Sequence, residues 1–318
     1  NNFINFCFHN IFELAKTFNK KAGAMTTSNL GLSFLVLTMN LSAYSILGSI
    51  IGYKLNNNQI NLSSKNAAYC TFFTTLISAI CLVYAFVTND FSIKYVFNHS
   101  NLSMNPAYTW VAMYAGNEGS LLYIALIISL SILLVLKFKP KDLIESEPHL
   151  IALMSGFLLF FISVMVFFAN PFDTFQSNIP SDGRGMNPLL AHPGMFSHPP
   201  LLMAGLATIS VPFSLITSML LTGTFRNNGL DFVRTTSLIV WCILGVGLLL
   251  GSWWAYTILG WGGYWVWDPI ENVGLMPWLV MTAFIHSIIV QRRRGMFRVW
   301  NVILIFLAFV LAQFGMFI

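Results

Sequence analysis

The residues best suited to chemistry gather in one tryptophan-rich stretch, residues 251–278, which reads GSWWAYTILGWGGYWVWDPIENVGLMPW. Six of the nine tryptophans fall there: Trp253, Trp254, Trp261, Trp265, Trp267 and Trp278. Glycines beside them, Gly262 and Gly263, permit close backbone approach, and the indoles offer flat stacking area. This combination suits a large planar ligand. The alternative is the belt of Trp and Tyr that marks any membrane–water interface.

Two histidines stand out by their position. His198 precedes Pro199-Pro200, which suit the first turn of a helix, so it is held at the mouth of a predicted span. His286 lies in TAFIHSIIV, about 9 Å from the basic end at Arg292 if the segment is helical. A histidine at that depth in lipid needs a partner. The alternatives are a helix cap or surface group for His198 and a helix–helix hydrogen bond for His286.

The acidic residues give weaker signals. Glu118, in AGNEGSLLYI, lies early in a predicted span, where an ionisable group is a functional hypothesis by default. A paired or solvated carboxylate near the interface is the alternative. Asp268 and Glu271 lack an accompanying nucleophile or metal cluster, so we expect them to fix the loop by accepting backbone N–H groups near a helix start. The four cysteines form no C-x-x-C, which excludes a c-type cytochrome and a thioredoxin-like pair.

These residues must be positioned by membrane helices. The chain is 56% hydrophobic and 8% charged, against about 25% charged in soluble domains. We predict an all-α, polytopic membrane helix bundle whose eight spans are near 29–53, 67–89, 107–136, 149–169, 200–224, 235–258, 275–291 and 299–318. The net charge of +5 indicates no nucleic-acid partner, because the basic residues lie between apolar spans.

The basic residues also predict the orientation. One set of loops and span ends holds eleven: Lys54, Lys65, Lys137, Lys139, Lys141, Arg226, Arg234, Arg292, Arg293, Arg294 and Arg298. The other set holds Lys94 and Arg184, so the first set is expected to face the cytoplasm or the mitochondrial matrix. The loops 90–106, 170–200 and the tryptophan loop then share the outer face. Residues 1–25 are expected to be an amphipathic or disordered lead-in, and 26–318 one transmembrane domain that carries the tryptophan loop at 251–278.

The segment WGGYWVWDPIENVGLMPWL closely resembles the "WWD" signature of the haem-handling membrane proteins CcmF and CcsA. Three further segments agree with CcmF in order: GNEGSLL at 116–122, GRGMNPLL at 183–190 and HPGMFSHPPLL at 192–202. The resemblance covers roughly residues 26–318. It departs from the family at Asn117, where CcmF proteins usually have histidine, and at His192, where they usually have an acidic residue and which is a possible rival iron ligand.

The resemblance implies a subunit of a cytochrome c haem lyase, which joins haem to the two thiols of an apocytochrome C-x-x-C-H motif. It implies that His198 binds haem iron on the outer face and that His286 binds a b-type haem in the membrane. Arg184 would pair with a haem propionate. The haem platform would comprise Trp253, Trp254, Gly262, Gly263 and, as the residues that promote catalysis, Trp261, Trp265, Trp267 and Asp268.

The resemblance also implies partners. In CcmF a second outer histidine and a second membrane histidine come later in the sequence, so we expect the amino-terminal part of a split mitochondrial-type CcmF, completed by a carboxy-terminal CcmF chain. Other expected partners are a CcmE-type haem chaperone, a CcmH-type thiol protein, apocytochrome c and the lipid bilayer. The richness in Asn, Ile, Phe and Lys favours the mitochondrial inner membrane over a bacterial plasma membrane, with the tryptophan loop in the intermembrane space.

Three other functions remain open from the sequence. One is a haem exporter or CcsA-type synthetase, which shares the tryptophan signature. Another is a structural membrane subunit of a larger respiratory assembly that retains the motif without lyase activity. The last is a proton-translocating or transporter subunit built around Glu118, which is disfavoured because the sequence shows no inverted repeat.

Overall fold

The computed structural model describes residues 27–258, 260, 263–267 and 269–316, with the side chain of residue 270 excepted. Within these ranges eight helices are long and apolar enough to cross a membrane, which confirms the predicted all-α polytopic bundle. They span Thr27–Lys54, Asn58–Val87, Asn117–Phe138, Glu147–Phe167, Pro193–Thr222, Asn227–Ile258, Glu271–Arg294 and Arg298–Gly315. The lead-in expected at 1–25 lies outside the described residues.

The chain divides into two compact units. The first unit comprises Asn1–Ser129 and Leu158–Asn187, and the second comprises Leu130–Phe157 and Pro188–Ile318. The division falls within α6 (Asn117–Phe138) and α7 (Glu147–Phe167). The first unit also holds α2 (Thr27–Lys54), α3 (Asn58–Val87), α4 (Lys94–His99), α5 (Pro106–Thr109) and η1 (Val111–Tyr114). The second unit holds η2 (Lys141–Leu143), η3 (Pro188–Leu190), η4 (Pro193–Phe196), α8 (His198–Thr208), α9 (Ser210–Thr222), α10 (Asn227–Ile258), α11 (Pro269–Arg294) and α12 (Arg298–Gly315).

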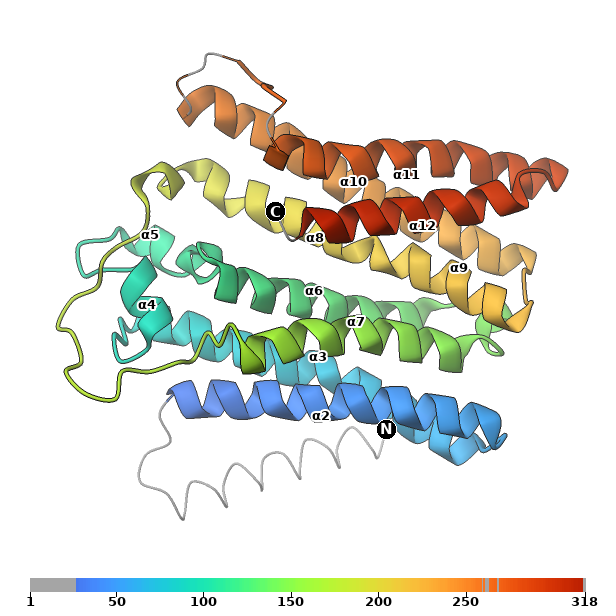
Figure 1. The fold of residues 1–318 in the computed structure, drawn as a ribbon, viewed down its shortest axis with the longest axis horizontal. Helices are drawn as coiled ribbons and strands as arrows, with labels where there is room; N and C mark the ends of the chain where they lie inside the picture. The colour runs from blue at the N-terminus through green and yellow to red at the C-terminus, as the bar shows by residue number, and fades with distance from the viewer. Residues whose placement is uncertain (1–26, 259, 261–262, 268, 317–318) are drawn as a thin grey trace. The chain divides into compact units, whose positions relative to one another are not determined.

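In the first unit, α2 and α3 form a closely packed hairpin (Figure 1). Helix α3 begins nine residues earlier than the expected start at 67, because the side chain of Asn57 caps it by accepting the N–H groups of Gln59 and Ile60. The buried contact is rich in small and hydroxyl side chains, and Thr38 donates to the Thr74 hydroxyl at 2.8 Å. Such side chains let helices approach closely where lipid supplies no hydrophobic drive between them.

The start of the third span also differs from the expectation at 107. Residues 106–114 form the short helices α5 and η1, and the long helix α6 begins only at Asn117. The buried hydroxyl of Tyr95 holds this break, because it donates to the carbonyl of Met113 at 2.9 Å and accepts the N–H of Gly116 at 3.0 Å. Glu118 therefore lies in the first turn of α6, early in the span as predicted.

In the second unit, the span predicted at 200–224 is two helices. Helix α8 ends at Thr208 and α9 begins at Ser210, with Ile209 between them. Pro212 accounts for the break, because it lacks the N–H that would bond to the carbonyl of Thr208. Helix α8 packs along α10 at Gly247, where an added Cβ would lie 2.8 Å from the backbone nitrogen of Leu202.

Several basic residues of the second unit lie at one end of its long helices. Arg292, in the last turn of α11, binds both carboxylate oxygens of Asp231 in the first turns of α10. Arg226, between α9 and α10, pairs with Glu145 at 3.2 Å. Helices α8 and α10 run antiparallel. The start of α8 at His198 and the end of α10 before the tryptophan loop therefore lie at the same end, opposite the basic residues. The positions of the charges agree with the expected sidedness within this unit.

Candidate haem site

His198 is the first residue of α8, and its ring lies against α10. Its Nδ1 is 2.9 Å from the carbonyl oxygen of Gly247. A carbonyl can only accept a hydrogen bond, so Nδ1 carries the proton and Nε2 of the neutral ring keeps its lone pair. A backbone carbonyl on the second ring nitrogen is the usual way proteins orient a metal-binding histidine. His198 is thus prepared to ligate through Nε2.

Two residues of α10 shape the space around this ring. A Cβ added at Gly251 would lie 2.5 Å from Cε1 of His198, so the ring occupies the place of a side chain. The indole of Trp254 meets the imidazole edge-on, with the ring centres 5.5 Å apart. The sequence pattern indicated the histidine at a helix start, but the role of Gly251 follows only from the packing of α8 on α10.

His192, the possible rival ligand, has the opposite arrangement. Its Nδ1 accepts the N–H of Gly194 at 3.0 Å, so the proton of the neutral ring is on Nε2. That nitrogen faces the hydroxyl of Thr257 at 3.4 Å. The ring packs against Trp253 and Trp254, with centre distances of 5.1 and 6.1 Å. His192 therefore caps η4 and braces the two indoles, and it presents no free lone pair.

The described part of the tryptophan loop is held by the start of α11. Glu271 accepts the N–H groups of Val266 at 2.9 Å and Trp267 at 2.8 Å, which confirms the predicted role for this carboxylate. Asn272 donates to the carbonyl of Trp267 at 2.9 Å. These bonds hold Trp267 at a left-handed φ of 61°, with 69% of its surface exposed. Trp261, Gly262 and Asp268 lie outside the described residues, and Gly263 is half-buried.

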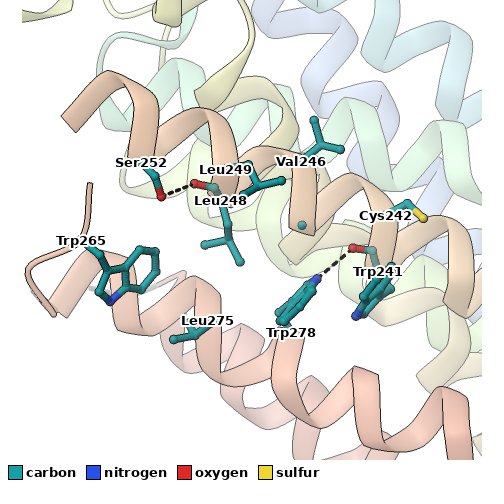
Figure 2. Close-up of a pocket in the computed structure, with 10 residues that line it drawn as sticks. Trp241, Cys242, Val246, Leu248, Leu249, Ser252, Trp265, Leu275 and Trp278 are labelled. Carbon is teal, nitrogen blue, oxygen red and sulfur yellow. Dashed lines mark hydrogen bonds between the residues drawn. The ribbon is translucent and has the colours of Figure 1, made fainter. Parts of the chain in front are cut away.

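A pocket of about 420 Å³ opens between α10 and α11 (Figure 2). The stacked indoles of Trp241 and Trp278, 5.1 Å apart between ring centres, line one end, and Trp265 lines the other. The remaining lining is Cys242, Gly245, Val246, Leu248, Leu249, Ser252 and Leu275. The Nε1 of Trp265 is buried, and within the described ranges it has no hydrogen-bond partner. The size and the apolar walls suit a ligand of several rings.

The sequence did not indicate this pocket, because Trp241 and Cys242 lie within an apolar predicted span, outside the tryptophan-rich stretch. The signal in the sequence was a second tryptophan, Trp278, within the next predicted span. The pocket and His198 use different faces of α10. Residues two apart are about 200° apart around a helix, so Leu249 in the pocket points away from Gly247 and Gly251 at His198. Among the described residues, the second unit therefore has two candidate ligand sites: the ring of His198, and the pocket between α10 and α11.

His286 lies on an exposed face of α11, two turns beyond Trp278. Its Nδ1 is 2.8 Å from the carbonyl of Thr282 in the same helix, so this nitrogen does not make the helix–helix hydrogen bond of the alternative interpretation. The proton is again on Nδ1 and the lone pair on Nε2. The Thr282 hydroxyl accepts Nε1–H of Trp241 at 2.7 Å, and Trp278 donates to the Trp241 carbonyl at 3.2 Å. Hydrogen bonds thus link His286 to the indoles of the pocket.

Arg184 belongs to the first unit, where its motif packs on α4. The N–H of Arg184 donates to the carbonyl of Phe97 at 2.8 Å, and its guanidinium lies 5.3 Å from the centre of the Phe97 ring. A Cβ at Gly183 would lie 2.0 Å from the carbonyl oxygen of Ser100. Loop 90–106 and the 170–187 segment therefore lie together, as predicted. Arg184 and the sites at His198 and Trp265 belong to different units.

The GNEGSLL segment packs on the same short helix. A Cβ at Gly116 would lie 2.4 Å from Nε2 of His99. Burial raises the pKa of the Tyr95 phenol well above its usual range, so its hydroxyl stays protonated and keeps the bond to Met113. Glu118 is half-buried in the first turn of α6, where the positive end of the helix dipole stabilises a carboxylate. This position favours the interfacial, structural interpretation of Glu118.

Comparisons with known proteins address the chain as a whole. It is 36% identical over 295 residues to the cytochrome c-type biogenesis protein CcmF of Haemophilus influenzae, covering 92% of this chain and 45% of that protein. It is 37% identical over 286 residues to CcmF of Escherichia coli K12, covering 89% and 43%. The solved structure of "Cytochrome c Heme Lyase CcmF" matches with a TM-score of 0.82 and 32% identity, over 93% of this chain and 47% of that one.

The chain thus spans less than half the length of the CcmF proteins that it matches. The matched region is their amino-terminal part. A family model described as "Cytochrome C assembly protein" matches residues 114–318, which include the GRGMNPLL and HPP segments and the whole tryptophan loop. The chain therefore belongs to the cytochrome c assembly protein family, among its CcmF-like membrane proteins.

Proposed function

We propose that this chain is the haem-binding amino-terminal part of a two-chain cytochrome c haem lyase. One observation carries the proposal: His198 and His286 each donate Nδ1–H to a backbone carbonyl and each leave Nε2 free to bind a metal. Neutral imidazole oriented in this way is a common haem-iron ligand. Imidazole binds several metals, and the family and the CcmF relatives support haem iron as the metal here.

The residues present fit haem at both positions. His198 would hold iron at the outer mouth of α8, beside the indole of Trp254. His286 would hold the iron of a b-type haem from the exposed face of α11. When bound, haem supplies the vinyl groups that become thioethers, and the nucleophiles are the two thiols of the apocytochrome. The chain needs no nucleophile of its own, so its part is to position the reactants and exclude water.

The tryptophan loop would form the platform for the transferred haem. Glu271 accepts the backbone N–H of Trp267, which supports this role because the bond holds the backbone that carries the exposed indole. We assign stacking to Trp261, Trp265 and Trp267, close backbone approach to Gly262 and Gly263, and loop support to Asp268. Trp253 and Trp254 would brace the mouth at His198, and Arg184 would bind a propionate by a bidentate pair.

The second iron ligands would come from a carboxy-terminal CcmF chain. The exposed face of α11 around His286 supports this, because a ligand there needs a cover that the described residues do not supply. The further partners that we propose are a CcmE-type haem chaperone, a CcmH-type thiol protein and apocytochrome c. The membrane would be the mitochondrial inner membrane, with the tryptophan loop in the intermembrane space.

The test is a pyridine haemochrome and reduced-minus-oxidised spectrum of the native complex, with its polypeptides identified. A non-covalent b-type haem that co-purifies with a second, histidine-bearing chain would support the proposal. His286→Ala should remove the b-type band, whereas His192→Ala should leave it, because His192 offers no ligating nitrogen. A complex without haem, whose only companions are respiratory subunits, would instead indicate a structural subunit.

A further inference from the structure

The turn between α11 and α12 has a defined shape. Helix α11 ends at Arg294, and Gly295 follows in a left-handed conformation with φ of 69° and donates its N–H to the carbonyl of Gln291 at 2.8 Å. Phe297 is also left-handed, with φ of 65°, and α12 begins at Arg298. Below the turn, the buried side chain of Asn301 donates to that of Gln291. This bond joins the two helices and fixes the turn.

The turn surrounds a shallow hollow of about 610 Å³. Its lining is Gly295, Phe297, Arg298, Val299 and Trp300. The side chain of Arg298 and the backbone of the first turn of α12 meet there. Figure 1 shows the corner where α11 passes into α12. The hollow therefore combines a guanidinium with a helix start.

The charge at this corner is positive and largely unopposed. Arg292 is neutralised by its bidentate contact with Asp231. For Arg293, Arg294 and Arg298, the part of the chain that the structure describes supplies no ion pair. Arg298 lines the hollow, and Arg293 and Arg294 lie in the last turn of α11 directly before it, so the local charge favours an anion such as phosphate.

The backbone at the hollow adds to this preference. Asn301 donates its N–H to the carbonyl of Phe297 and so makes the first bond of the helical pattern in α12. The three amides before it belong to the first turn, where no intrahelical carbonyl is available. Amides of this kind bind phosphate together with a cation.

The apolar surface around the hollow identifies the source of the phosphate. Val299 is 74% exposed and Trp300 is 55% exposed, while Met296 and Phe297 are each 49% exposed. Such side chains at the end of a spanning helix face glycerol backbones and acyl chains. The positive charge alone would be enough to orient the chain in the membrane. The hollow and its apolar rim go beyond that role, because they could hold one lipid headgroup.

We propose that the turn from Gly295 to Trp300 is a binding site for the phosphate headgroup of an anionic phospholipid of the inner leaflet, with Arg298 as its central contact and Arg293 and Arg294 as supporting charges. Basic pockets between membrane helices on this side bind such lipids by the same chemistry. The proposal is independent of haem.

The test uses the native complex in nanodiscs of phosphatidylcholine doped with phosphatidylglycerol. Bound lipid is counted by native mass spectrometry. We expect anionic lipid to be retained selectively, and we expect its affinity to fall about five-fold for each arginine removed, which corresponds to about 1 kcal/mol per charge. Arg298→Gln and the triple variant R293Q/R294Q/R298Q test this series. Arg226→Gln is the matched control, because Arg226 lies on the same predicted side but pairs with Glu145.

Two further measurements separate the alternatives. Inorganic phosphate should compete only weakly, because it lacks the acyl chains that the apolar rim would contact. Competition by phosphate at equal affinity would overturn the lipid assignment. Arg298→Lys keeps the charge and the fold but not the bidentate fork, so it should retain less lipid than the native chain and more than Arg298→Gln. Equal retention by Arg226→Gln and the triple variant would also overturn the proposal.

Discussion

His198 and His286 present the same ring nitrogen from very different surroundings. His198 is half-buried and held by a second helix, through the carbonyl of Gly247, the gap at Gly251 and the edge of Trp254. His286 is exposed and held by a carbonyl of its own helix. The orientation of the first therefore depends on tertiary packing, whereas the orientation of the second is set within its own helix.

The largest expected effect is at Gly251. In Gly251→Ala the new Cβ would overlap the His198 ring and break its bond to Gly247. A displacement of about 1 Å at a reacting group can cost about 100-fold in rate, so we expect holo-cytochrome c formation to fall by at least that factor. The measurement is covalent haem on a reporter cytochrome, normalised to the amount of inserted chain.

Gly156→Ala is the matched control for this change. Gly156 also lies within a long helix, and an added Cβ there would have open space. It should leave cytochrome c formation unchanged. Normal activity in Gly251→Ala would mean that the position of the His198 ring is not important for the reaction.

Substitutions in the tryptophan loop should also lower holo-cytochrome c formation. Trp265→Ala and Trp267→Ala remove stacking area that the loop presents beside the start of α11, and we expect each to lower holo-cytochrome c formation strongly, though less than Gly251→Ala, while insertion is retained. Phe168→Ala, a change at a side chain that is 87% exposed in the first unit, is the control for loss of an exposed aromatic group. Normal maturation in both tryptophan variants would contradict the platform.

Glu271→Gln should have a smaller effect. The carboxylate oxygen that accepts two backbone N–H groups becomes a neutral amide oxygen, which weakens hydrogen bonds to a charged acceptor that are worth about 1.5–3 kcal/mol. We expect about a ten-fold loss of activity and faster proteolysis of the loop, with the b-type band at His286 unchanged. Glu145→Gln, at an exposed ion pair with Arg226, is the control, and an equal loss there would remove the special role of Glu271.

The contrast between the two histidines also shows how far the sequence leads. Apolar runs predicted all eight spans, and the Pro-Pro pair after His198 predicted a helix start. The sequence also predicted that the carboxylate of Glu271 accepts backbone N–H groups, because side-chain acceptors are favoured at helix starts. Each of these features depends on residues that are close in sequence.

The features that the sequence did not reveal depend on contacts between distant residues. The pocket requires Trp241 of α10 and Trp278 of α11 to stack, and helical periodicity alone does not say which faces meet. The tautomer of His198 depends on Gly247, which is 49 residues away. Helix α6 starts later than predicted because the hydroxyl of Tyr95 bonds the backbone before it. The apolar composition of this segment alone predicts a continuous helix.

The smallest expected effect is at Thr282 and bears directly on the comparison. Thr282→Val removes the hydroxyl that accepts Nε1–H of Trp241, but it keeps the carbonyl that orients His286. We expect a loss of about 1 kcal/mol in the free energy of unfolding and an unchanged b-type band. Thermal unfolding monitored at the haem band measures both. If the band shifts or disappears, the orientation of His286 depends on the indole network, and the two histidines are then both positioned by tertiary contacts.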